Sequence, residues 1–326
     1  VTAQTLLAPP GTVPAECTQT SATSFTCTGD LSDGLDIDGP VGSVTDVTVE
    51  SLTAPIAPAA FDQGIDFDIA GDGDAVLTDD TGAFGISTFD EDGINVNVDG
   101  EGSVSVTSSG DISAGGRAIN TRVESGSISI RSDGALVSDS EGIDSRNFGS
   151  NGGSISITSN SSINSGISAI EADVLTGTIQ ILSTGDIVAG DEAIQAEING
   201  DGSIDIDSSG SISTTGDNSQ VIVADVNGDG SIRIKSSGEI TTQGARSSGI
   251  EADTNDGTIF ITSDSDITTN AERSNGSFAD SDGDSVTIRS SGAIETSGEM
   301  SDGISGGAAG TGTVTINSYG NIISDG

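Results

Sequence analysis

Gly230-Ser-Ile-Arg-Ile-Lys-Ser-Ser-Gly-Glu-Ile-Thr241 decides the fold, because the chain repeats this stretch with small changes. Related copies follow one another at spacings of 24 to 28 residues. They start at Gly102, Gly126, Gly153, Gly177, Gly202, Gly230, Gly257, Asp284 and Gly312, with aspartate in place of glycine at one position. A repeat of this length predicts one supersecondary unit that buries its apolar face by stacking on its neighbours.

The first strand of the repeat is predicted by two apolar residues, two and four positions after its start, with mostly polar residues between them. Alternation with a period of two residues is typical of a β-strand with one buried face. The pairs are Val104 and Val106, Ile128 and Ile130, Ile155 and Ile157, Ile179 and Ile181, Ile204 and Ile206, Ile232 and Ile234, Ile259 and Ile261, Val286 and Ile288, and Val314 and Ile316.

Three further sets of like residues complete each repeat. A serine with the same inward parity follows the pair, and we expect its hydroxyl to be buried and hydrogen-bonded to backbone or to other serines. These serines are Ser108, Ser132, Ser159, Ser183, Ser208, Ser236, Ser263, Ser290 and Ser318. A second apolar set is Ile112, Leu136, Ile163, Ile187, Ile212, Ile240, Ile267, Ile294 and Ile322, and a third is Ile119, Ile143, Ile170, Ile194, Ile222, Ile250, Phe278 and Ile304. Three short strands per coil predict an all-β, single-stranded parallel β-helix, or β-solenoid, of about ten coils.

The repeat divides the chain into three stretches. Residues 1–42 contain Pro9, Pro10, Pro14 and Pro40, and we expect an N-terminal leader that caps the first coil. Residues 43–326 form the β-helix, with divergent coils over 43–101 and regular coils over 102–326.

Cys17 and Cys27 are the two cysteines of the chain and precede the regular repeats. In an exported protein they would close a short loop through a disulfide. Two buried free thiols are the alternative.

Composition excludes several classes of partner. The chain has 51 acidic and 9 basic residues and a formal net charge of -42. Nucleic acids and anionic membrane surfaces are bound through clustered Lys and Arg, so neither is an expected partner. No stretch has the ~20 apolar residues of a membrane helix, so we expect no insertion of this chain into a membrane. A chain so acidic could also be disordered, but disorder gives no reason for isoleucine to recur in register.

Catalysis is not indicated by the residue types present. The chain has no histidine, which removes imidazole bases and the usual His-containing zinc sites. We therefore expect no catalytic residue, and no cofactor apart from weakly held calcium. A β-helix enzyme acting on polysaccharide is the lesser alternative, and it would need a groove that gathers acids, arginines and aromatic residues.

Acidic turns just before the first strands are the candidate metal ligands. Oxygen ligands on glycine-rich turns suit calcium, although D-G and N-G pairs are also ordinary turn formers. The candidate residues are Asp72, Asp74, Asp201, Asp229, Asp282 and Asp284.

A family resemblance rests on the texture of the repeat. Pro9-Pro-Gly, Cys17, Thr26-Cys-Thr-Gly-Asp-Leu, Asp66 to Ile69 and the G-S-I-S-I-x-S-x-G and A-I-x-A elements resemble the passenger region of Gram-negative autotransporters. The repeat-rich alphaproteobacterial type is the most similar. The resemblance implies export with removal of a signal peptide, an outer-membrane translocator domain, and a β-helical passenger on the cell surface. Nothing in this sequence resembles the translocator.

These observations predict a non-enzymatic, exported surface β-helix with a structural or adhesive role, located outside a Gram-negative cell. Its partners would be other surface proteins, glycans or copies of itself, contacted through variable loops such as Thr214 to Gln220 and Asn270 to Ser277. The sequence stops within a repeat, at Ile322 to Gly326. This motivates the alternative of a subunit that assembles end to end or laterally into an extracellular filament or biofilm matrix.

Overall fold

A computed structural model describes residues 4–7, 16–40, 45–150 and 152–325 of the chain. These residues form β-strands and no helix, and parallel strands stack as a β-solenoid of about 11 turns. The predicted all-β parallel β-helix is therefore confirmed. The chain divides into two compact units, Val1–Ser165 (unit 1) and Gly166–Gly326 (unit 2). Of the described residues, none belongs to a helix with the length and hydropathy needed to span a membrane.

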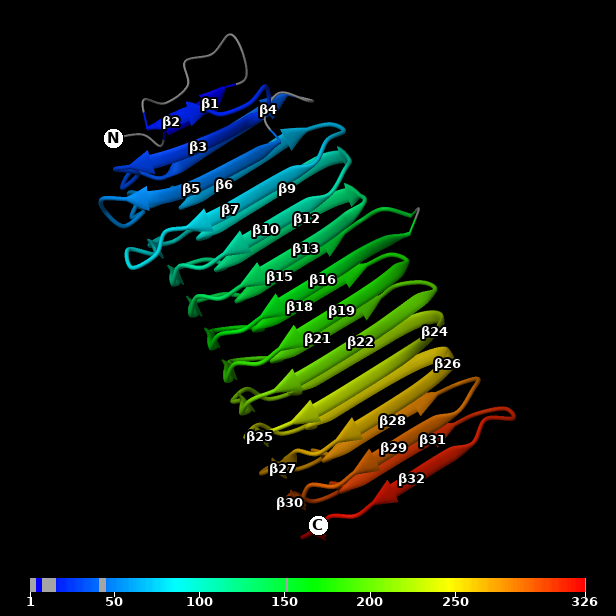
Figure 1. Cartoon of the computed structure of the whole chain (residues 1–326). Helices are drawn as coiled ribbons and strands as arrows, with labels where there is room; N and C mark the ends of the chain where they lie inside the picture. Colours follow the sequence, from blue (N-terminus) through cyan, green and yellow to red (C-terminus); the bar gives the residue numbers. More distant parts are fainter. Residues whose placement is uncertain (1–3, 8–15, 41–44, 151, 326) are drawn as a thin grey trace. The chain divides into compact units, whose positions relative to one another are not determined.

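Unit 1 contains the strands β1 to β17, drawn from blue to green in Figure 1. Their bounds are β1 Gln4–Leu7, β2 Cys17–Gln19, β3 Ser24–Gly29, β4 Leu35–Pro40, β5 Asp46–Leu52, β6 Ile65–Ala70, β7 Ala75–Asp80, β8 Ile86–Ser87, β9 Ile94–Glu101, β10 Val104–Ser108, β11 Ile112–Ala114, β12 Ile119–Ser125, β13 Ser127–Ser132, β14 Leu136–Ser138, β15 Ile143–Asn147, β16 Gly153–Ser159 and β17 Ile163–Ser165.

One regular coil of unit 1 consists of β10, β11 and β12, which is the predicted set of three short strands. Each strand pairs in parallel with its equivalents one coil away: β10 with β7 and β13, β11 with β8 and β14, and β12 with β9 and β15. The register aligns like with like, as in the pairing of Ile112 with Leu136 and of Ile119 with Ile143. A side chain on Gly126, whose φ is +132°, would overlap the carbonyl oxygen of Gly102. Glycine starts the repeat because the backbone of the neighbouring coil leaves no room there for a side chain.

The N-terminal region begins the stack earlier than the sequence suggests. Within the predicted 1–42 leader, β3 pairs in parallel with β5, and β4 with β6. For this reason the solenoid has about 11 turns, where the sequence predicts about ten. Pro9, Pro10 and Pro14 lie outside the described residues.

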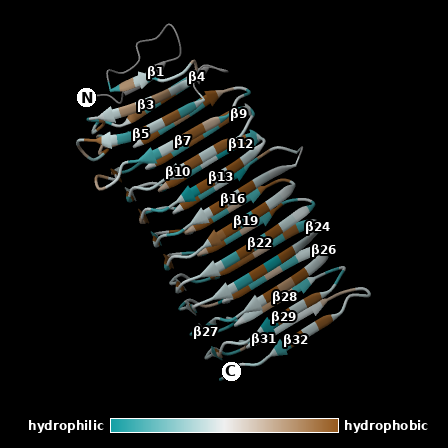
Figure 2. Cartoon of the chain, in the orientation of Figure 1, coloured by the Kyte–Doolittle hydropathy of each residue, from teal (hydrophilic) through white to brown (hydrophobic). Residues whose placement is uncertain are grey.

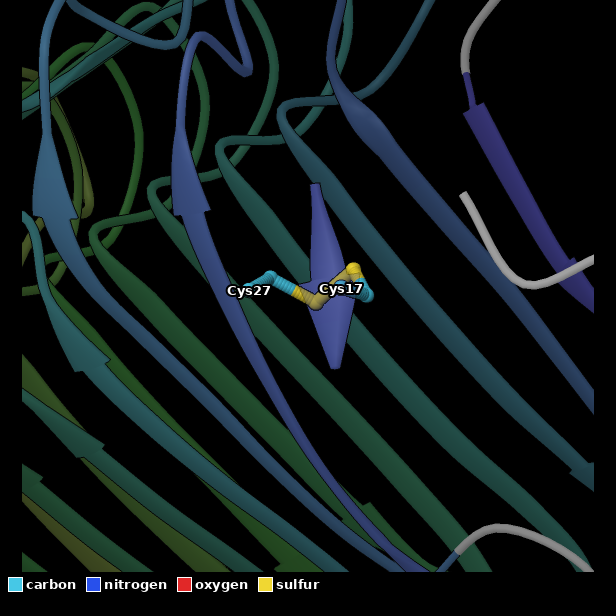
Figure 3. Close-up of a disulfide and its surroundings, with 2 residues drawn as sticks. All are labelled: Cys17 and Cys27. Atoms are coloured by element: carbon cyan, nitrogen blue, oxygen red, sulfur yellow. A yellow bond between two sulfur atoms is a disulfide. The ribbon is translucent and has the colours of Figure 1, made fainter. Parts of the chain in front are cut away.

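A disulfide joins β2 and β3 near the N-terminal end of the described chain. β2 pairs with β3 in antiparallel fashion, with Cys17 opposite Cys27. Their sulfur atoms are bonded at 2.00 Å, and both residues are buried (Figure 3). The free-thiol alternative therefore does not describe this structure.

Unit 2 contains the strands β18 to β33, drawn from green to red in Figure 1. Their bounds are β18 Ile170–Val174, β19 Gly177–Ser183, β20 Ile187–Ala189, β21 Ile194–Ile198, β22 Gly202–Ser209, β23 Ile212–Thr214, β24 Ile222–Ser237, β25 Glu239–Thr242, β26 Ile250–Ser263, β27 Asp266–Thr269, β28 Ser277–Ser281, β29 Val286–Ser290, β30 Ile294–Thr296, β31 Ile304–Ala308, β32 Val314–Ser318 and β33 Ile322–Ser324. β24 and β26 each join the third strand of one coil to the first strand of the next.

The core of each unit consists of the predicted apolar sets, except in the last coil, where Val314, Ile316 and Ile322 are exposed. In unit 1, Val104, Val106, Ile112 and Ile119 are all at most 1% exposed. The alternation of hydrophobic and hydrophilic residues along the strands is visible in Figure 2. Burial of such columns is the main stabilising term, at about 25 cal/mol per Å² of apolar surface.

The serine of the repeat is buried as predicted in eight of the nine copies, whereas Ser318 in the last coil is exposed. The hydrogen bonding of these serines varies. The Ser108 hydroxyl donates to Asp79 Oδ2 at 2.8 Å, and that of Ser236 donates to Ser263 Oγ at 3.0 Å. Ser183 Oγ and Ser208 Oγ have no hydrogen-bond partner in the described part of the chain. The expected ladder of serine hydroxyls is therefore present at some coils only.

Phe278 is a correction to the third apolar set. In the structure Ser277 pairs with both Ile250 and Ile304 and takes the inward position, with 1% exposure. Because successive residues of a strand point to opposite faces, Phe278 lies on the outer face. Gly276 therefore aligns with Gly249 and Gly303, the residues just before the neighbouring strands. The sequence-based alignment of Phe278 with Ile250 was off by one residue, and a shift of one residue exchanges the inward and outward faces of a strand.

Candidate functional site

The predicted calcium ligands of unit 1 accept hydrogen bonds from backbone. Asp72 Oδ1 accepts from the Glu101 N–H, and Asp74 Oδ1 accepts from the Ser103 N–H, each at 2.9 Å. The donors lie one coil further along the chain. These carboxylates therefore satisfy backbone donors at the corner where the sheet ends.

Of the candidate calcium ligands in unit 2, Asp201 also accepts a hydrogen bond from backbone. Asp201 Oδ1 accepts from the N–H of Asp229 at 2.9 Å. Asp282 lies beside a cavity of this unit, and the N–H of Asp284 donates to Ser281 Oγ at 3.2 Å. Within the described ranges no three acidic or cysteine side chains are grouped as metal ligands. Calcium binding stays a prediction.

Polar side chains on the outer face of unit 1 form a different arrangement, which we call the acid–amide column. Asp66, Asn95, Asn120 and Asp144 lie in register on β6, β9, β12 and β15. Asn95 Nδ2 donates to Asp66 Oδ1 at 2.7 Å, and Asn120 Nδ2 donates to Asn95 Oδ1 at 2.8 Å. Each amide donates one hydrogen bond to the side-chain oxygen of the column member one coil earlier in the chain.

A second column, the amide–arginine column, lies two residues further along the same strands. It contains Asp68, Asn97, Arg122 and Arg146 in register. Asn97 Nδ2 donates to Asp68 Oδ1 at 2.8 Å. The guanidinium of Arg122 lies 4.4 Å from the centre of the Phe148 ring, which is a cation–π geometry.

Asp144 ends the acid–amide column among positive charges. It is 1% exposed, and its carboxylate contacts Arg117 Nε at 3.0 Å and Arg146 Nε at 2.9 Å. Arg117 also lies 3.3 Å from Glu141 and 3.7 Å from Asp92. A buried carboxylate is tolerated here because two guanidinium groups neutralise it.

Asn95 and Asn120 of the first column, and Asp68, Asn97 and Arg122 of the second, line a groove made of two adjoining cavities. One, of about 440 Å³, is lined by Asp68, Asp92, Asn97, Asn120 and Arg117 among others. The other, of about 510 Å³, is lined by Asp72, Glu124 and Phe148 among others. Asp99 and Arg122 line both. Each volume is in the range of small-molecule sites, and we refer to the pair as the unit 1 groove.

Burial changes the proton affinity of acids around the unit 1 groove. Burial raises the pKa of Asp66 to about 7, although the hydrogen bond from Asn95 opposes the shift. Burial also raises the pKa values of Asp68 and Asp92, against the hydrogen bond from Asn97 and that from the Arg117 backbone N–H respectively. For Glu141 burial acts in the same direction, but hydrogen bonds from Ser140 and the Arg117 charge outweigh it and leave its pKa lowered.

Unit 2 carries at the same repeat position a carboxylate column with no amide and no arginine. Its members are Asp173, Glu197, Asp225, Asp253 and Asp280, in register on successive strands. Burial, followed by repulsion from Asp253, raises the pKa of Asp225 to about 7. Burial, followed by repulsion from Glu251, raises the pKa of Asp253 to about 6. An adjoining cavity of about 350 Å³ is lined by these two aspartates, Asp280 and Phe278.

The sequence did not predict the unit 1 groove. Its residues come from four coils, and their identities change from coil to coil, so no single motif marks them. One signal was present: four of the nine basic residues, Arg117, Arg122, Arg131 and Arg146, fall within 30 residues of one another. Arg117 and Arg122 line the groove, and Arg146 pairs with Asp144 of the acid–amide column.

Comparison of the chain with protein-family models, with curated proteins and with solved structures gave no match. The class that the fold defines is the β-solenoid.

Proposed function

We propose that this protein is an exported, non-enzymatic β-solenoid that has a structural and adhesive role at the surface of a Gram-negative cell. The observation that carries the adhesive role is the unit 1 groove, where polar side chains of β6, β9 and β12 and of the loops that precede them line about 440 Å³ of open space. A scaffold alone does not need such a groove, since the apolar columns already stabilise the coils.

Export is supported by the disulfide between Cys17 and Cys27. Structural disulfides persist in oxidising compartments outside the cytosol. The resemblance of the repeat to autotransporter passengers points to the same location.

Labelling of intact cells that produce the protein tests this proposal. We expect antibodies against the folded chain to label unpermeabilised cells, and added protease to remove the label. Cells lacking the protein should adhere less to the surfaces they colonise. Labelling that requires permeabilisation, or unchanged adhesion, would contradict the surface-adhesive role.

An enzyme acting on polysaccharide is the second candidate, because the unit 1 groove combines acids, arginines and one aromatic ring. A raised carboxyl pKa is typical of a general acid. However, Asp66, the acid with a pKa of about 7, is not among the residues that line either cavity. Asp144 is covered and paired with two arginines, which leaves it unavailable as a base. These two facts favour binding over hydrolysis.

Release of reducing ends separates the two candidates. We expect the purified chain to release none from uncharged polysaccharides over a day at pH 5 to 8. Release that disappears in the Asp92→Asn variant would establish the enzyme instead.

A further inference from the structure

We propose that the unit 1 groove binds an uncharged glycan chain that lies along the stack of coils, across β6, β9, β12 and the segment 148–150 that follows β15. This rests on the proposed adhesive function and names its partner. The geometry is that of a repeating surface, because in-register columns present side chains every ~4.8 Å along the stack. A linear polymer can contact several such coils at once.

The lining suits hydroxyl groups. Hydroxyls both donate and accept hydrogen bonds, and the unit 1 groove offers amide, carboxylate and guanidinium side chains together. Asn97 uses one of its two Nδ2 hydrogens on Asp68, and its neighbour in the column, Arg122, is exposed. Both donors and acceptors are therefore available at the surface of the groove.

One lining atom lacks a partner. Gln63 Oε1 is buried beside the 440 Å³ cavity and accepts no hydrogen bond from any described residue. A buried acceptor without a partner destabilises the structure. A turn of the Gln63 side chain toward the cavity lets a ligand hydroxyl donate to this oxygen.

Charge argues against ionic ligands. Asp68, Glu91, Asp92 and Asp99 line the cavity together with only two arginines, within a chain of net charge -42. An anionic ligand is therefore repelled. A basic peptide would be attracted by the acids but would meet Arg117 and Arg122, and it would find almost no apolar lining for its side chains.

Phe148 supplies the apolar contact that a sugar ring needs. Its ring is 43% exposed, beside the 510 Å³ cavity, and Arg122 covers part of it. Tight packing of an apolar ring face against an aromatic side chain adds to hydrogen bonding in orienting a ligand.

Isothermal titration calorimetry with the whole purified chain tests the proposal. The probes are uncharged tetrasaccharides of glucose, galactose, mannose and N-acetylglucosamine, with tetragalacturonate and tetralysine as charged comparisons. We expect at least one uncharged probe to bind, with an affinity that changes less than twofold between 0.05 and 0.5 M NaCl. Tetragalacturonate should not bind.

Two pairs of variants locate the binding. Arg122→Ala should weaken it at least about tenfold, because the hydrogen bonds of a charged group are lost. Arg131→Ala, which removes an exposed arginine paired with Asp133 outside the groove, should leave it unchanged. Phe148→Ala should weaken it, whereas Phe84→Ala, which removes a phenylalanine of similar exposure (47%), should not.

Three outcomes overturn the proposal: no uncharged probe binds at 10 mM, binding is equal in Arg122→Ala and Arg131→Ala, or tetralysine alone binds. The last assigns the unit 1 groove to a basic protein segment. None of them affects surface labelling of intact cells, so the adhesive function and its glycan partner fail separately.

Discussion

The amide–arginine column of unit 1 and the carboxylate column of unit 2 occupy the same position of the repeat and differ in charge. Both lie three residues after the first inward residue of the third strand. In unit 1, Asn97 separates Asp68 from the cationic side chains. In unit 2, Glu197, Asp225, Asp253 and Asp280 follow one another with no neutral or positive residue between them.

The difference shows what the solenoid requires of its outer face. Parallel coils place like positions ~4.8 Å apart, so every charge in a column meets its neighbours above and below. Unit 1 offsets part of these charges by hydrogen bonds and ion pairs, although burial still raises the pKa values of Asp66 and Asp68. In the carboxylate column of unit 2, repulsion between neighbouring acids adds to burial and raises the pKa values of Asp225 and Asp253 to about 7 and about 6. The apolar core is the same beneath both kinds of column, so the residues of the outer face can differ between the units without loss of the fold.

Removal of the positive charges in unit 1 is expected to have the largest effect. In the double variant Arg117→Met and Arg146→Met, the buried carboxylate of Asp144 loses both ion pairs. We expect a loss of about 3–5 kcal/mol in the free energy of unfolding, measured by urea denaturation.

Two controls accompany this double variant. Arg131→Met breaks an exposed pair with Asp133 and should cost at most about 1 kcal/mol. Adding Asp144→Asn to the double variant should restore much of the loss, because no buried charge is then left alone. Equal losses in the exposed and the buried variants would refute the role of charge compensation.

Substitutions that place an acid in the column of unit 1, or an amide in the column of unit 2, are expected to have smaller effects on the free energy of unfolding. Asn97→Asp removes the hydrogen bond to Asp68 and places two like charges side by side, at a cost of about 1–3 kcal/mol. Asp253→Asn places an amide between Asp225 and Asp280, and we expect a gain on the order of 1 kcal/mol at pH 8.

The control for the gain is Glu239→Gln, which removes the same charge from an exposed position of unit 2. Hydrogen exchange of the strand peptides assigns each effect to its unit. If Glu239→Gln stabilises as much as Asp253→Asn, net charge explains the gain and the column does not.

How far the sequence predicts this molecule depends on which face is considered. The inward face is predictable because burial admits few residue types, so Ile112, Ile187 and Ile267 mark their strands directly. Phe278 is the exception: its apolar character suggested an inward position, but parity places it outside. The disulfide was one of two states that the sequence left open for Cys17 and Cys27, and the structure has the bonded one.

The unit 1 groove was not predictable because solvent admits many residue types on the outer face. Asn97 contacts Asp68 from 29 residues away, while Asn120 contacts Asn95 from 25 residues away. With the spacing itself variable, only the register of the strands identifies which residues become neighbours. For the candidate calcium ligands Asp72 and Asp74, by contrast, the sequence shows the acidic turn but not its role. In the structure both carboxylates accept hydrogen bonds from backbone N–H groups.

A dependence on pH follows from the raised pKa values of unit 2. The folded-state pKa of Asp225 is about 7, and that of Asp253 is about 6, against about 3.9 in an unfolded chain. The folded state therefore binds more protons than the unfolded state between about pH 4 and pH 7, and stability falls as pH rises through this window. Each group contributes a slope of at most about 1.4 kcal/mol per pH unit.

The double variant Asp225→Asn and Asp253→Asn should flatten this slope in urea midpoints measured from pH 4.5 to 7.5. Asp66→Asn should flatten it less, because it removes a single group with a pKa of about 7. A profile unchanged by the double variant would assign the pH dependence to acids outside the carboxylate column.

Salt should have the smallest effect and should separate the two units most cleanly. Raising NaCl from 0.1 M to 1 M shortens the Debye length from about 10 Å to about 3 Å, which is less than the spacing of neighbours in a column. Repulsion among Asp225, Asp253 and Asp280 is then screened, and hydrogen-exchange protection of β24, β26 and β28 should rise. Protection of β9, β12 and β15 should change less. Their ion pairs at Asp144 are mostly buried, and salt screens a buried pair much less than an exposed one. Since both units experience the same solution, an equal rise in both would mean that general salt effects outweigh the column charges.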